Sequence, residues 1–94
     1  MAQQLFGGIR IVEQHAAGGM PQKAQTAWDS AMCEFVGANY EPITFVGDQL
    51  VNGTNYWYIA SQKTVTEDPV YHIVKICINE FGGKHTIESI ERIF

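Results

Sequence analysis

One apolar stripe between residues 24 and 36 constrains the fold of this chain more than any other feature. Its apolar residues recur at spacings of three and four over more than three turns, which is the pattern of a helix with one apolar face. They are Ala24, Ala27, Trp28, Ala31, Met32, Phe35 and Val36. Pro21 suits the first turn of such a helix, and residues 37–39 predict its end. Because three alanines permit close approach, we expect a sheet to cover this face with little room for a pocket, and Trp28 and Phe35 to be the large fillers.

The rest of the chain has the composition of β-strands. The segments 43–49, 54–64, 70–79 and 85–93 are the strand candidates, with Pro42 just before the first of them and a further short strand starting at Ile9. In the last segment, Ile87, Ile90 and Ile93 recur at a spacing of three, which either a β-bulge or a short helical turn would explain. The connections are too short for parallel crossovers. We therefore expect an α+β fold in which one long amphipathic helix is wrapped by a four- to five-stranded antiparallel sheet.

The pair Asn52-Gly53 separates the first two long strand candidates and predicts a tight hairpin. Both central positions of a type I′ turn need a positive φ, which Asn and Gly tolerate best. Apolar Leu50 and Val51 stand directly before this pair. Turn tips are normally polar, so apolar residues at this tip predict a surface that meets a partner.

The segment Gln49-Leu50-Val51-Asn52-Gly53 resembles the Gln-x-Val-x-Gly loop of the cystatins. The Thr-Asn-Tyr-aromatic run that follows is similar to their next strand, and the order of glycine, helix, hairpin and two more strands extends the resemblance over nearly the whole chain. The small, disulfide-free, intracellular stefins are the most similar type. The resemblance implies a cystatin-like fold and reversible, tight, non-covalent inhibition of papain-like (cathepsin-type) cysteine proteases, through a wedge inserted into the active-site cleft.

The resemblance also implies which residues form the wedge. An N-terminal arm (residues 1–8), the first hairpin tip and a second tip at residues 81–84 would line up on one edge. The protease-binding residues are then Leu5, Phe6, Gly7, Gly8, Gln49, Leu50, Val51, Asn52, Gly53, Phe81 and Gly82. Read by itself, the flexible arm is equally consistent with a frayed terminus.

Two departures from the family pattern predict weaker or narrower inhibition than that of a typical stefin. The second tip carries Phe81 followed by two glycines, where stefins place Leu-Pro and secreted cystatins place Pro-Trp. Asn52 replaces the usual small residue of the first tip. The alternative function is a cystatin-fold interaction domain that does not inhibit proteases. A domain-swapped dimer through the first hairpin is the alternative to a monomer.

The chain lacks the residue spacings of an enzyme or a metal protein. His15, His72 and His85 fall on three different elements, and no His-x-x-x-His or Cys-x-x-Cys spacing is present. We expect no catalytic residues, no metal and no cofactor. Cys33 and Cys77 are interpreted as two reduced, largely buried thiols, with Cys33 in mid-helix; a disulfide between them is the alternative.

Length and charge limit the number of domains and the kinds of partner that this chain can have. The 94 residues fit one domain over 1–94, and the net charge of −4 with no basic cluster argues against nucleic acid and anionic membranes as partners. No segment approaches the ~20 apolar residues that span a bilayer. Met1 without a leader predicts a cytoplasmic protein, although secretion without a leader remains open. Asn52-Gly53-Thr54 is a glycosylation sequon, which is expected to stay unmodified in the cytoplasm.

Overall fold

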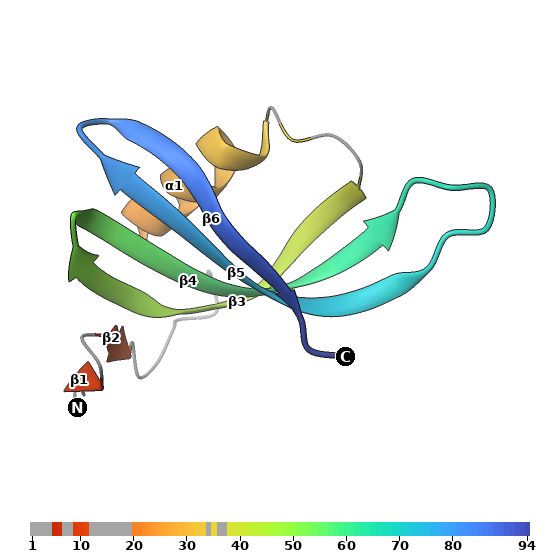
Figure 1. The fold of residues 1–94 in the computed structure, drawn as a ribbon, viewed down its shortest axis with the longest axis horizontal. Coiled ribbons are helices and arrows are strands. Elements are labelled where there is room, and N and C mark those ends of the chain that lie inside the picture. The colour runs from red at the N-terminus through yellow and green to blue at the C-terminus, as the bar shows by residue number, and fades with distance from the viewer. Residues whose placement is uncertain (1–4, 7–8, 12–19, 34, 36–37) are drawn as a thin grey trace.

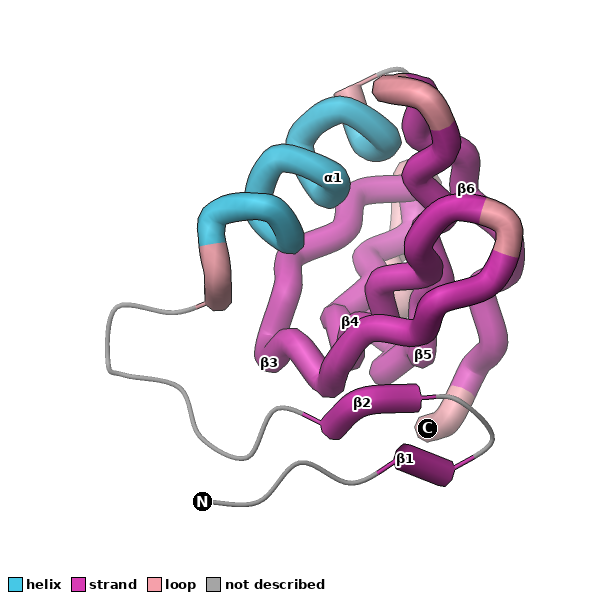
Figure 2. The backbone as a smooth tube through the Cα atoms, turned by 90° about the vertical axis from the view of Figure 1, so that its left-hand side faces the viewer, coloured by secondary structure: helices cyan, strands magenta, loops and turns pink. Residues whose placement is uncertain are grey.

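Over the part of the chain that the structure describes, the fold is one helix packed on one face of an antiparallel sheet (Figures 1 and 2). The computed structural model describes residues 5–6, 9–11, 20–33, 35 and 38–94. The strands follow one another across the sheet in the order β1-β2-β3-β4-β5-β6, with every neighbouring pair antiparallel. The elements are β1 (Leu5–Phe6), β2 (Ile9–Ile11), α1 (Gln22–Met32), β3 (Ala38–Val51), β4 (Gly53–Thr64), β5 (Tyr71–Phe81) and β6 (Lys84–Arg92). The predicted α+β class with one helix on an antiparallel sheet is confirmed.

The core lies between α1 and the long strands. Ala24, Ala27 and Trp28 are the buried residues of α1, and the close approach that the alanines permit brings Trp28 against Tyr58 of β4, with the two ring centroids 5.1 Å apart. The Tyr58 hydroxyl donates a hydrogen bond of 2.8 Å to the carbonyl of Ala24. Burial raises the pKa of Tyr58 far above its usual range. On β5, Val74, Ile76 and Ile78 alternate along the strand and are all buried, as is Cys77 between the last two.

The helix is shorter than its apolar stripe predicts. The helix ends at Met32. The N–H of Phe35 donates a hydrogen bond to the Met32 carbonyl, and this tight turn provides a partner for a carbonyl at the end of the helix. Phe35 is therefore beyond the helix and 37% exposed, where it packs edge-on against Tyr40 of β3 instead of filling the core. The prediction of Phe35 as a large core filler is wrong. Val36 lies outside the described residues.

The strand β3 begins at residue 38, five residues before the predicted segment. Pro42 lies inside β3, opposite Ala60, and not before the strand. It is tolerated there because β2 pairs only with residues 47–49, so the first part of β3 is an edge that needs no donor from Pro42. The register then slips by one residue, which leaves Ile43 without a partner on β4.

The irregular spacing of isoleucines in β6 reflects a bulge. Cys77 pairs with Ser89 and Ile78 pairs with Ile87, so Glu88 is an extra residue. This insertion lets both Ile87 and Ile90 pack against the core. The bulge interpretation is confirmed and the helical turn is excluded.

The two cysteines differ in environment. Cys77 is buried in β5, where burial, followed by the charge of Glu88, raises its pKa to about 11. Cys33 is exposed at the end of α1, so the prediction of a buried mid-helix thiol is wrong for Cys33; the early end of the helix is the reason. Both are free thiols. No helix of the described residues is long and apolar enough to cross a membrane.

Candidate functional site

Three segments that are distant in sequence meet at one end of the molecule (Figure 1). The first tip (residues 49–53) joins β3 to β4, and the second tip (residues 81–84) joins β5 to β6. The third segment is the β1–β2 pair, in which Leu5 is opposite Arg10; β2 in turn lies along β3, with Ile9 opposite Gln49. Figure 2 views the molecule from this end and shows β2 beside the long strands and β1 outside it. Gly7 and Gly8 lie outside the described residues.

The first tip has one residue in the left-handed region. Gly53 has a φ of 86°, whereas none of the described non-glycine residues has a positive φ, so Asn52 does not. The prediction of a type I′ turn at Asn52-Gly53 is wrong, because that turn needs both. In the observed register Val51 is opposite Gly53, so Asn52 alone stands between the paired residues at the point of the turn.

The second tip has the conformation that the sequence predicts for the first. Gly82 and Gly83 have φ values of 60° and 85° and form a two-residue loop between the paired residues Phe81 and Lys84. This is the pattern of a type I′ hairpin. The N–H of Gly83 donates a hydrogen bond of 2.9 Å to the carboxylate of Glu80, which holds the glycine-rich loop in place.

The two tips touch each other. Thr54, directly after the first tip, pairs with Glu80, directly before the second. A Cβ atom added at Gly53 would collide with the Glu80 carbonyl oxygen and lie 3.0 Å from the Cβ of Phe81. The backbone of the first tip is therefore in direct contact with the second, and only glycine fits at this position.

A network of side-chain amides ties β3, β4 and β5 together behind the tips. The Gln49 Oε1 accepts hydrogen bonds of 3.3 Å from Asn55 Nδ2 and from Trp57 Nε1. Asn79 Nδ2 donates to Asn55 Oδ1 at 2.9 Å and to the Asn52 carbonyl at 3.1 Å. The network anchors both ends of the first tip, and Asn79 carries it to the strand that leads into the second. Gln49 was predicted as a site residue from the sequence, whereas Asn55, Trp57 and Asn79 were not, because their shared face follows from strand parity only once the register is known.

The tips present large apolar side chains to solvent. Leu50 is 84% exposed, Val51 is 48% exposed and Phe81 is 60% exposed. Each stands on a turn whose backbone is held by the contacts above. This apolar edge has the properties of a surface that becomes buried on contact with a partner.

A hollow of about 420 Å³ lies directly behind the first tip, between the start of α1 and the ends of β3 and β4. Leu50 is at one side, with Phe45, Ala24 and the half-buried Asp48 among the other lining residues. Tyr56 also lines it, and burial, then the carboxylates of Glu80 and Asp48, raise the pKa of Tyr56. The prediction that the alanine-lined contact leaves little room for a pocket is wrong here, because the hollow opens at the start of α1, where Ala24 itself is one of its lining residues.

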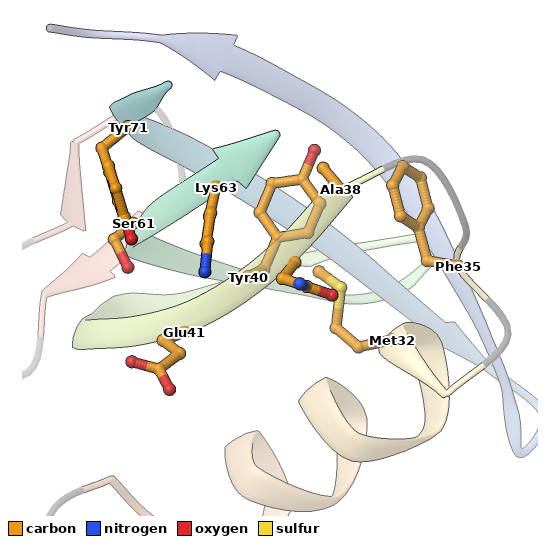
Figure 3. Close-up of a pocket in the computed structure, with 9 residues that line it drawn as sticks. Met32, Phe35, Ala38, Tyr40, Glu41, Ser61, Lys63 and Tyr71 are labelled. Carbon is orange, nitrogen blue, oxygen red and sulfur yellow. The ribbon is translucent and has the colours of Figure 1, made fainter. Parts of the chain in front are cut away.

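A second hollow, of about 520 Å³, lies at the other end of the molecule (Figure 3). Met32, Phe35 and Tyr40 form its apolar side, and Figure 3 shows Lys63 and Tyr71 across from them. The Lys63 Nζ lies 5.8 Å from the centre of the Tyr71 ring. None of the predicted site residues contributes to this hollow, so it is separate from the tips.

Among the described residues, no group of three or more His, Cys, Asp or Glu side chains is placed to hold a metal ion. Comparison of the chain with protein-family models, with curated proteins and with solved structures found no match. The resemblance to cystatins therefore rests on residues 49–53 and on the order of the elements.

Proposed function

We propose that this protein is a cystatin-like, reversible and tight-binding inhibitor of papain-like cysteine proteases, and that the two tips enter the active-site cleft. The observation that carries the proposal is the apolar edge: Leu50, Val51 and Phe81 are exposed on two turns that touch each other. Such a pair of rigid tips fits a narrow cleft with apolar walls. In this proposal the tips inhibit by occupying the cleft, without a covalent step.

Affinity in this mechanism comes from apolar burial at low entropic cost. Full burial of a side chain such as Leu50 contributes about 1.5–3 kcal/mol. The amide network and the contact of Gly53 with Glu80 already order the tips before binding, so little conformational freedom is lost on association. The glycines of the second tip do not weaken this argument, because Glu80 holds Gly83.

The test is a titration of papain and of one lysosomal cathepsin with the monomeric protein. Stoichiometric inhibition that is reversed on dilution is expected. Leu50→Ala removes exposed apolar surface without touching the core, so it should weaken inhibition. Val65→Ala is the control, because Val65 is also an exposed aliphatic residue (63% exposed) but lies beyond β4, at the opposite end from the first tip, and should leave inhibition unchanged. Absence of inhibition by the folded monomer at micromolar concentration would refute the proposal.

The monomer is the inhibitory form in this proposal. If two copies exchanged the part of the chain that ends with β3, the turn at Gly53 would open and join β3 and β4 into one continuous strand, and the apolar tip would then be lost inside the dimer. A sizing column run beside the inhibition assay separates the two forms. Inhibition that elutes with the dimer would contradict the mechanism.

A further inference from the structure

Asn52 stands apart from the other asparagines of this chain. Of the four, Asn39, Asn52, Asn55 and Asn79, only Asn52 is followed by a glycine. It is exposed at the outer point of the first tip, and within the described residues its side-chain amide makes no hydrogen bond. In contrast, the amides of Asn55 and Asn79 are both held in the network behind the tips.

We propose that Asn52 is a site of spontaneous deamidation and that this reaction switches off the first tip. The backbone nitrogen of Gly53 attacks the side-chain carbonyl carbon of Asn52 and forms a five-membered succinimide. The bond from that carbon to the side-chain nitrogen breaks, and ammonia leaves with the proton that the Gly53 N–H gives up. Water then opens the ring at one of its two carbonyls, which yields either aspartate or isoaspartate at position 52.

The fold keeps the susceptible pair in place. A side chain on residue 53 would block the approach of its nitrogen to Asn52, but the turn cannot accept one, because φ is 86° and a Cβ would collide with the Glu80 carbonyl. The packing that makes the first tip rigid therefore requires glycine at position 53, and this same glycine leaves Asn52 open to attack by the backbone nitrogen that follows it.

Both products damage the apolar edge. Each adds a carboxylate beside Val51 and Leu50, and the burial of an unpaired charge in a binding cleft is costly. Isoaspartate also adds a backbone carbon to a turn in which Val51 and Gly53 are paired, which moves Gly53 away from Glu80. The loss of inhibition that we expect from these changes rests on the proposed function, whereas the deamidation itself does not.

The reaction is tested by ageing the folded protein at mildly alkaline pH and mapping its peptides by mass spectrometry, with the chain in denaturant as the positive control. The expected result is aspartate and isoaspartate at position 52, with Asn39, Asn55 and Asn79 unchanged, and no such conversion in Asn52→Gln. An unchanged Asn52 in the folded protein, over a time in which the denatured chain converts it, would overturn the proposal. So would equal conversion at the other three asparagines.

The effect on function is tested separately. The deamidated form carries one more negative charge, so ion exchange separates it from fresh protein, and it should inhibit papain at least about tenfold more weakly. Asn39→Asp is the matched control, because it adds the same charge at the opposite end of β3 and should inhibit as the fresh protein does. Equal inhibition by the two separated forms would overturn the switch. If fresh protein does not inhibit at all, the proposed function fails, while the peptide map still decides whether the reaction occurs.

Discussion

The two hairpin tips at one end of this protein are built on glycines that have the same backbone conformation but opposite surroundings. Gly53 and Gly83 have φ values of 86° and 85°. An added Cβ at Gly53 would strike the backbone of β5, whereas at Gly82 or Gly83 nothing lies within 4 Å. The first tip is thus fixed by contact with a neighbouring strand. The second is fixed by its own turn geometry and by the bond from Gly83 to Glu80.

The two tips therefore require glycine for different reasons. At the second tip, glycine is required only because its φ is positive, which is a local property of the chain. At the first tip, it is also required because two strands of the sheet approach there. The tip with the apolar residues Leu50 and Val51 is therefore the one whose shape depends on the rest of the fold.

The largest effect is expected for Gly53→Ala, which introduces both a strained φ and a collision with Glu80. We expect the free energy of unfolding to fall by about 2–4 kcal/mol. Urea denaturation measures the change. Gly83→Ala, which introduces the strained φ alone, is the matched control and should cost about 1 kcal/mol. Equal losses for the two variants would show that the tips do not touch. For the same reason, a large residue at position 53 is a poor probe of binding, because it alters the fold.

The next effect concerns the apolar side chains of the two tips. Leu50→Ala should raise the inhibition constant for papain by about 10- to 30-fold, from the loss of about 1.5–2 kcal/mol of buried apolar surface. Phe81→Ala reports on the second tip in the same assay. If Leu50→Ala weakens inhibition and Phe81→Ala does not, binding is confined to the first tip; the proposed two-tip wedge requires both to weaken it.

A smaller effect is expected for Asn79→Ala, which removes the link from β5 to the first tip. Two hydrogen bonds are lost from partly exposed groups, so the free energy of unfolding should fall by about 1 kcal/mol. Amide hydrogen exchange should accelerate at residues 50–54 and remain unchanged at residues 82–83, because only the first tip depends on Asn79. Faster exchange at both tips would show that the second tip also depends on Asn79.

The smallest effect is expected for Gly82→Asn. Its φ of 60° lies within the left-handed region that asparagine tolerates, and open space surrounds the position. The free energy of unfolding should change by less than about 0.5 kcal/mol. A loss as large as that of Gly53→Ala, measured in the same urea series, would mean that the second tip is also packed against a neighbour.

Much of the fold was predictable because it depends on short-range patterns. The period of three and four residues identified the face of α1 that is buried, and the spacing of isoleucines along β6 indicated an irregularity for which a bulge was one of two explanations. The start of β3 could not be predicted, because Pro42 normally ends a strand and is tolerated here only on an unpaired edge. The end of α1 was also mispredicted, since the apolar period continues past Met32 to Phe35, which packs on Tyr40 instead of extending the helix.

By itself, the sequence determined that one helix would cover an antiparallel sheet, and that residues 49–53 and 81–84 would be turns with apolar residues beside them. These features follow from periodicity and from turn chemistry, which act over a few residues. Only the tertiary structure decided that the first turn needs one positive φ and not two, that Asn79 holds it, and that Gly53 lies against Glu80. Those outcomes depend on which strands become neighbours and in what register, and contacts between residues about 27 positions apart are set by the packing of the whole sheet.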